Sequence, residues 1–280
     1  MTDLAVSFGN SPTLVGVVSE PETVLPGSPT VIILNSGLLH KVGPFRLSVT
    51  LARRLAVIGY RVLRMDISGI GDSKMRVVRD STHKALLDVD YAMNFMSKDF
   101  GSQKFVLMGL CSGADNAHRT AVADERVVGT VNLDGYCATN FMYTLHYYGE
   151  RFLSWKFISS KLQRFTAARK STTPSDKSKE VFDPNADALL RSFPSRKQMG
   201  IEFSQLISRN VKMLYVYTRG VEYYCNYANQ LFDILKPNKI RDCVDVQLYP
   251  YDDHTWSRTE ARKKLINSIC LWMQKTFHQL

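Results

Sequence analysis

Short apolar runs alternate along the chain with segments whose apolar residues recur at helical spacing. Residues 30–35 read TVIILN, an apolar and β-branched run typical of a buried parallel strand. In residues 46–59 apolar positions recur at roughly helical spacing, and Gly59 ends the pattern. Further strands are expected at residues 60–66, 104–109, 126–134, 211–218 and 243–249, and further helices at 83–96, 112–123, 223–236 and 260–277.

This alternation predicts an α/β protein. Strands that alternate with helices imply right-handed crossovers and a mostly parallel central sheet with helices on both faces. Residues 5–9 and 14–21 could add an antiparallel hairpin at one edge. A length of 280 residues suits one large domain or two small ones.

The rhythm breaks between Cys137 and Arg209, where Tyr, Phe, Lys and Arg are frequent and a polar Ser/Thr/Pro/Lys run occupies the middle. The strand pattern resumes afterwards and completes the same sheet, which favours an insertion over a second domain. We therefore assign residues 1–136 and 210–280 to the core, and residues 137–209 to an inserted helical cap.

A strand, the pentapeptide GLCSG at residues 109–113 and a helix follow one another in the middle of the chain. A strained strand-to-helix turn of the form G-x-nucleophile-x-G is the nucleophile elbow of the α/β-hydrolase fold, where small flanking residues let two backbones approach. The alternative is a buried thiol in an ordinary turn. The context favours Cys111 as a nucleophile.

The other parts of such a site occur in the expected order. NSGLLH follows an early strand, so the N–H groups of Leu38 and of Ser112 are candidates for an oxyanion hole. DISGIGDS, residues 66–73, is interpreted as a structural loop that borders the site. His254 follows the last strand and is the candidate base.

The acid that orients this imidazole has two candidates. Glu222 follows the penultimate strand and is preferred, whereas Asp134 ends the strand before it. Either carboxylate could accept the second imidazole N–H and stabilise the imidazolium.

The motifs NSGLLHKVGPFR, VLRMDISGIGDS, GLCSGADNA and DDHTWSR together resemble those of bacterial α/β-hydrolases described as exosortase-A-system-associated, and of related hydrolases with a cysteine nucleophile. The resemblance spans most of the chain, including LHYYGERFLSWKFISSKL in the expected cap. It implies the α/β-hydrolase fold and the triad, but not the substrate. Two departures are Trp256 at an aromatic position and Glu222 where aspartate is usual.

A cysteine nucleophile indicates acyl chemistry. A thiol beside a helix N-terminus and a histidine is partly or largely thiolate, and it exchanges readily with a thioester. We expect a thioesterase, esterase or acyltransferase that acts on an acyl ester or thioester in a biosynthetic pathway. One alternative is a cyclising release enzyme, of a Dieckmann type or forming a lactone or lactam, for which Asp134 would suit as the acid. Another is a catalytically silent binding protein of the same fold.

The formal net charge of +10 suggests a partner of opposite sign. No nucleic-acid-binding module is recognisable. Two interpretations of the basic residues of the cap stay open: they only keep the cap soluble, or they form a docking surface for an acidic acyl carrier protein. The basic residues are Lys156, Lys161, Arg164, Arg169 and Lys170. Aromatic residues of the cap are expected to line an acyl pocket over Cys111. They are Tyr147, Tyr148, Phe152, Trp155 and Phe157.

Expectations about cofactors and cellular location come from sequence patterns that are not found. The five cysteines lack C-x-x-C spacing, which argues against a zinc site and a disulfide framework, and we expect no cofactor. No apolar run reaches the roughly 18 residues of a membrane span, and the N-terminal residues do not resemble a secretory signal. We therefore expect a cytoplasmic protein.

Overall fold

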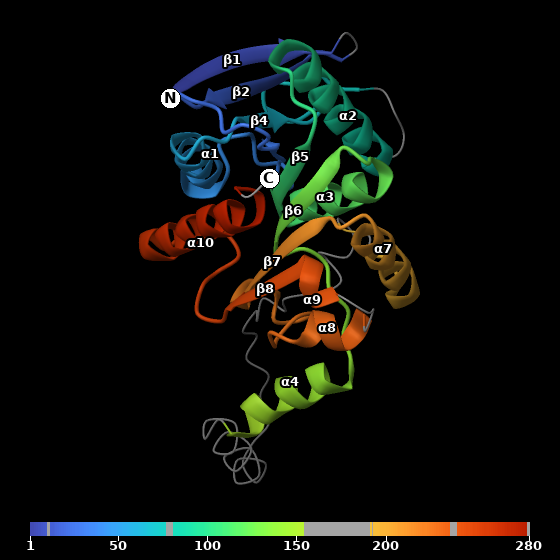
Figure 1. Ribbon diagram of the computed structural model, residues 1–280. Helices are drawn as coiled ribbons and strands as arrows, with labels where there is room; N and C mark the ends of the chain where they lie inside the picture. The colour runs from blue at the N-terminus through green and yellow to red at the C-terminus, as the bar shows by residue number, and fades with distance from the viewer. Residues whose placement is uncertain (10–11, 77–80, 154–190, 192, 236–239, 279–280) are drawn as a thin grey trace, which may run out of the picture.

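A single eight-stranded sheet forms the centre of the molecule (Figure 1). The computed structural model describes residues 1–9, 12–76, 81–153, 191, 193–235 and 240–278. The strand order is β1-β2-β4-β3-β5-β6-β7-β8. The strands are β1 (Thr2–Phe8), β2 (Leu14–Glu20), β3 (Thr30–Ile33), β4 (Val62–Asp66), β5 (Phe105–Leu110), β6 (Val127–Leu133), β7 (Lys212–Thr218) and β8 (Val244–Tyr249).

The strands from β3 to β8 run parallel, and β1 and β2 form an antiparallel hairpin at one edge, where β2 pairs with β4. Every residue of β3, β4 and β5 is buried, as expected for apolar strands covered on both faces. The mostly parallel sheet and the edge hairpin expected from the sequence are confirmed.

Helices cover both faces of the sheet (Figure 1). They are α1 (Leu47–Val57), α2 (Ser81–Phe100), α3 (Ser112–Ala123), α4 (Phe141–Leu153), α7 (Arg196–Ser208), α8 (Gln230–Leu235), α9 (Ile240–Cys243) and α10 (Thr259–Phe277), with the 3-10 turns η1 (Pro44–Arg46) and η2 (Arg219–Val221). One apolar core lies between the sheet, α1 and α10, and the other lies between the sheet, α2, α3 and α7.

The described residues of the region assigned to the cap include two helices, α4 and α7, that pack in different places. Met199, Phe203 and Leu206 of α7 are buried in the core that contains α3. Their spacing of four and three residues places them on one face of the helix, which packs on the sheet side. Helix α7 therefore belongs to the layer that covers the sheet, whereas α4 projects beyond α8 (Figure 1).

The prediction of a helix at residues 223–236 is confirmed only for its second half. Helix α8 begins at Gln230, and residues 223–229 follow an irregular path. The buried side chain of Gln230 accepts the N–H of Asn226 at 3.0 Å and donates to the carbonyl of Tyr224 at 2.6 Å. These bonds satisfy backbone groups that a helix would otherwise pair.

No helix in the described part of the chain combines the length and the apolar character that crossing a membrane requires.

Candidate active site

Cys111 lies in the tight turn between β5 and α3, with φ 57° and ψ −122°. The turn needs glycine on both sides. A Cβ on Gly109 would lie 2.2 Å from the carbonyl carbon of Gly113, and a Cβ on Gly113 would lie 2.4 Å from the carbonyl oxygen of Asn35. A non-glycine residue held at positive φ is strained, and such strain is common at functional turns. The thiol is partly exposed, as a nucleophile must be.

His254 lies in the loop between β8 and α10, and two neighbours hold this loop in place. Trp256, at φ 58°, is fully buried and makes an edge contact with the ring of Tyr249 at 5.1 Å. On the other side a Cβ on Gly220 would lie 2.6 Å from the Cβ of His254. The unusual tryptophan in DDHTW is therefore an anchor beneath the histidine loop.

Asp134 ends β6 and contacts the imidazole. Its Oδ2 lies 2.7 Å from Nδ1 of His254 and also accepts the hydroxyl of Thr218 at 2.8 Å, while Oδ1 accepts the N–H of Thr218 at 2.7 Å. The carboxylate is fully buried, and its residue has φ 50°. Three hydrogen-bonding partners around one buried carboxylate fix its orientation.

Glu222, the acid that the sequence pattern favoured, lies elsewhere. Its side chain is 52% exposed and pairs with Arg219 at 3.8 Å. It lines a surface groove of about 350 Å³ together with Tyr251. The geometry therefore favours Asp134 over Glu222 as the partner of His254, and it reverses the preference drawn from the sequence.

The protonation of His254 follows from these contacts. Burial alone would lower its pKa, but the bonds to Asp134 and to the Cys111 thiol raise the pKa to about 10. Since Nδ1 faces Asp134, Nε2 is the nitrogen available to Cys111. The imidazole therefore lies between a carboxylate and a thiol, with its charged form favoured.

The candidate oxyanion hole lies between the loop after β3 and the start of α3. Ser112 Oγ accepts the N–H of Gly37 at 2.8 Å, so this hydroxyl joins the two elements. Within the described residues, the N–H groups of Leu38 and Ser112 meet no hydrogen-bond acceptor. Both amides are therefore available to an oxyanion, in the region where the sequence placed them.

The side chain of Asp66 binds both ends of the loop that follows β3. The buried carboxylate accepts the side-chain amide of Asn35 at 3.1 Å and the N–H and Nζ of Lys41 at 2.6 and 2.8 Å. Asn35 in turn accepts the N–H of Ile67 at 2.6 Å, and Lys41 also pairs with Asp72. The loop at residues 66–73 is thus a support for the loop that carries Leu38.

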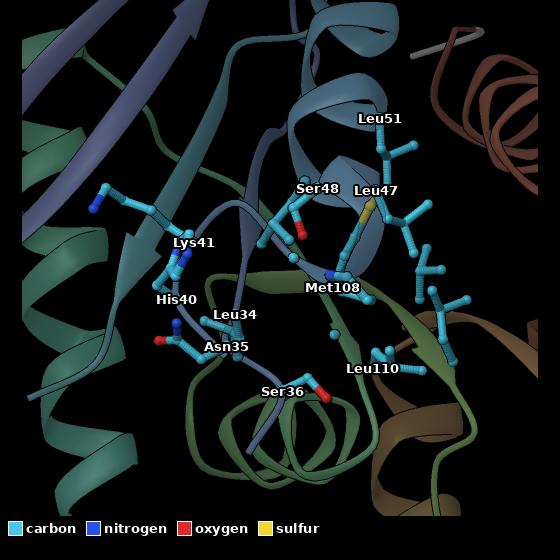
Figure 2. Close-up of a pocket in the computed structure, with 16 residues that line it drawn as sticks. Leu34, Asn35, Ser36, His40, Lys41, Leu47, Ser48, Leu51, Met108 and Leu110 are labelled. Atoms are coloured by element: carbon cyan, nitrogen blue, oxygen red, sulfur yellow. The ribbon is translucent and has the colours of Figure 1, made fainter. Parts of the chain in front are cut away.

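A small cavity lies between the loop after β3, helix α1 and the adjoining strands (Figure 2). Its volume is about 30 Å³, which is room for about two water molecules. Leu47, Leu51, Met108 and Leu110 give it an apolar wall. As it stands, the cavity is too small for an acyl chain.

The aromatic residues expected to line an acyl pocket are only partly described. Tyr147 is half-buried and Tyr148 exposed on α4, and their rings meet edge to face at 5.4 Å. Helix α4 is joined to the segment before α8, where the Tyr143 hydroxyl donates to the carbonyl of Tyr223 at 2.6 Å. Phe152 falls within α4 but its side chain is not described, and Trp155, Phe157 and the five basic residues proposed for carrier docking lie outside the described residues.

Arg191 is the residue at the site that sequence reasoning missed. Its buried guanidinium binds the Asp115 carboxylate through Nε and Nη2, each at 2.8 Å, and also donates to the carbonyl of Asp134 at 3.1 Å. No motif surrounds it in the sequence. Asp115 lies in the first turn of α3, and only its burial in the structure shows that this carboxylate requires a partner.

Metal binding finds no support among the described residues, where His, Cys, Asp and Glu form no group of three that could hold an ion.

Comparisons with known proteins give the fold. No protein-family model and no curated protein sequence matches the chain. Among solved structures, α/β hydrolase domain-containing protein 10 from mouse is 16% identical, with 98% of this chain and 99% of that chain covered and a TM-score of 0.53. An esterase from Pyrococcus furiosus is 13% identical, with 99% and 90% covered and a TM-score of 0.59. An epoxide hydrolase from Vigna radiata is 15% identical, with 98% of each chain covered and a TM-score of 0.54.

The chain therefore has the α/β-hydrolase fold, as the sequence predicted. Esterases and epoxide hydrolases both occur among these structures, so the fold alone does not determine the reaction. The finer resemblance to exosortase-associated hydrolases remains a prediction from the motifs.

Proposed function

We propose that this protein is an acyl-transfer enzyme that forms an acyl-cysteine intermediate on Cys111. One observation carries the proposal: the imidazole of His254 is held by the buried Asp134 at 2.7 Å and interacts with the thiol of a strained strand-to-helix turn. Nucleophile, base and orienting acid are the three parts that covalent acyl transfer needs.

In the first half-reaction the Cys111 thiolate attacks the carbonyl carbon of an ester or thioester, and the carbonyl electron pair moves onto oxygen. The N–H groups of Leu38 and Ser112 stabilise this oxyanion. When the intermediate collapses, the bond to the leaving group breaks, and Nε2–H of His254 gives its proton to the departing oxygen or sulfur. The product is an S-acyl cysteine.

In the second half-reaction neutral His254 removes a proton from the acceptor, which attacks the acyl carbon. Collapse of the second oxyanion intermediate returns the sulfur of Cys111 as a thiolate beside the imidazolium. An acyl-cysteine remains activated toward water, alcohols and amines, and thiol exchange with a thioester is close to thermoneutral. A thioester is therefore the substrate that we favour, and a thioesterase or acyltransferase is the reaction class.

The position of the acid favours a second candidate within the same chemistry. Asp134 follows β6 rather than β7, which is the arrangement we associated with cyclising release enzymes. In that case the acceptor would be a carbon, oxygen or nitrogen nucleophile within the acyl chain. Product analysis separates the two candidates, because cyclisation releases a product 18 mass units lighter than the hydrolysed acid.

The decisive experiment is the mass of the intact protein after incubation with short acyl thioesters of N-acetylcysteamine. We expect an acyl adduct on Cys111 that is absent from Cys111→Ala, while Cys243→Ala serves as the control for a buried thiol. No adduct and no turnover would leave a binding protein of this fold as the better description.

A carrier-bound substrate is the remaining part of the proposal. The net charge of +10 would speed encounter with an acidic acyl carrier protein, and this steering weakens with salt. We expect turnover of the carrier-bound acyl group to fall with salt more steeply than turnover of the same group on N-acetylcysteamine. Equal salt dependence would argue for a small-molecule substrate.

A further inference from the structure

One buried cation touches both of the residues that flank the candidate base. Arg191 has a side chain only 5% exposed, and its Nη2 donates to the carbonyl of Asp134 at 3.1 Å and makes a longer contact of 3.5 Å with the carbonyl of Cys111. The Asp115 carboxylate binds the same guanidinium through two oxygens. Arg191 thus joins the nucleophile turn, the end of β6 and helix α3.

The two carbonyls that Arg191 contacts belong to strained residues. Cys111 has φ 57° and Asp134 has φ 50°, both positive without being glycine. Such conformations persist only where the surroundings hold them. The Tyr224 hydroxyl adds a second donor to the carbonyl of Asp134 at 2.9 Å and lies 3.4 Å from Nη1 of Arg191. The guanidinium therefore stabilises both the turn at Cys111 and the turn at Asp134 through their carbonyl groups.

Aromatic rings shield this cation from water. The guanidinium carbon lies 4.8 Å from the ring centre of Phe193 and 6.0 Å from that of Tyr224. Burial by itself would lower the pKa of Arg191, yet the bonds to the Asp115 carboxylate and its negative charge raise the pKa above its usual value. In such a poorly solvated place a charge acts on its neighbours more strongly than it does at the surface.

We propose that Arg191 is a positioning residue of the active site, which holds the turns of Cys111 and Asp134 in register and whose positive charge favours the thiolate of Cys111. The alternative is a buried ion pair with Asp115 that only stabilises the fold. The two differ in one respect. If the charge of Arg191 acts on the sulfur, removing Arg191 and removing the charge of Asp115 must shift the pH midpoint of Cys111 alkylation in opposite directions. If the ion pair only holds the two turns together, both changes should shift this midpoint in the same direction.

The inference rests on the proposed function for the role of Cys111. The test measures the reactivity of the Cys111 thiol without any acyl substrate, so its outcome does not depend on whether the proposed function is right. Iodoacetamide is reacted with the protein between about pH 4 and 10, and the alkylation rate at Cys111 is followed by mass spectrometry. For the Arg191→Met variant we expect the midpoint of the rate profile to rise by about one pH unit or more, the shift typical of losing a nearby opposite charge. For Asp115→Asn we expect a lower midpoint.

Two further variants complete the design. Arg191→Lys keeps the charge but loses the planar fork, so we expect a midpoint close to that of the unaltered protein with a lower acyl-transfer rate. Arg61→Met is the matched control, because Arg61 also binds a carboxylate through two nitrogens, at 2.6 Å each to Glu20, away from the strand ends that carry the site. We expect no midpoint shift for this control.

Circular dichroism establishes that each variant is folded. Should Arg191→Met fail to fold, the direction of the midpoint shift in Asp115→Asn decides. An unchanged or raised midpoint in Asp115→Asn, or equal shifts in Arg191→Met and the Arg61→Met control, overturns the proposal and leaves a structural ion pair.

Discussion

Asp134 and Glu222 follow neighbouring strands of the sheet, but their surroundings differ in every respect. Asp134 is fully buried and receives two bonds from Thr218 and one contact from His254. Glu222 is half-exposed, and its ion pair with Arg219 is long, at 3.8 Å. The turn η2 explains the contrast, because it follows β7 directly and places Glu222 one turn further on, beside the surface groove. Which strand a carboxylate follows therefore matters less than how the backbone turns at its end.

The largest expected effect comes from removing the charge of Asp134. Asp134→Asn should lower the rate of acyl transfer by about 10⁴-fold, since the imidazole would lose the partner that fixes its tautomer and stabilises its charge. Steady-state hydrolysis of a short acyl thioester measures the rate. Glu222→Gln is the matched variant, and a larger loss from it than from Asp134→Asn would reassign the acid.

A second test follows the protonation of His254 by nuclear magnetic resonance. Because its pKa in the folded protein is about 10, the imidazole should remain charged at pH 8. The pKa lies above the ordinary value of 6.5, so the stabilising contribution is complete below about pH 6.5 and is lost as the pH rises through about 10. Asp134→Asn should lower the titration midpoint and flatten the stability profile over this range, and Glu222→Gln should change neither. A titration near 6.5 in the unaltered protein would contradict this geometry.

The support behind the acid gives a smaller effect. Thr218→Val removes the hydroxyl bond to Asp134, together with the 3.2 Å bond that the hydroxyl accepts from the N–H of Gly220, but keeps the side-chain shape and the backbone bond to Asp134. A lost bond to a buried charge costs about 1.5–3 kcal/mol, so we expect a rate lower by about 10-fold to 100-fold. Thr120→Val is the control, because within the described residues the Thr120 hydroxyl is buried with no partner. Equal losses from both variants would show that the Thr218 hydroxyl has no particular role in holding Asp134.

The smallest effect is expected at Glu222. Its ion pair with Arg219 is long and exposed, and such pairs contribute about 0–1 kcal/mol. Glu222→Gln should leave the activity within about twofold and the free energy of unfolding within about 0.5 kcal/mol. Chemical denaturation with urea provides the measurement, and a loss above 2 kcal/mol would show that the groove beside Glu222 is better organised than its contacts indicate.

Much of the fold and part of the site could be predicted because their signals are local. Apolar runs fixed the parallel strands, and Gly109 and Gly113 marked a turn where no side chain fits. His254 was recognisable from its place after the last strand. Each of these depends on a few adjacent residues.

The remainder depended on contacts between distant segments. Asp134 turns toward His254 through a positive φ at a non-glycine residue, which the sequence does not signal. Arg191 reaches Asp115 across 76 positions, and nothing near it indicates a buried ion pair. Helix α7 showed its apolar face at Met199, Phe203 and Leu206, but an amphipathic pattern does not say which layer covers it.

The contact between Cys111 and His254 also determines how the protein should respond to oxidants. Peroxides attack thiolates that solvent can reach, and Cys111 is partly exposed whereas the other four cysteines are buried. Oxidation should therefore begin at Cys111 and produce a sulfenic acid. Early damage should be reversed by dithiothreitol, and damage that has proceeded to the sulfinic acid should not. Purification without a reducing agent would then yield an inactive protein with its fold unchanged.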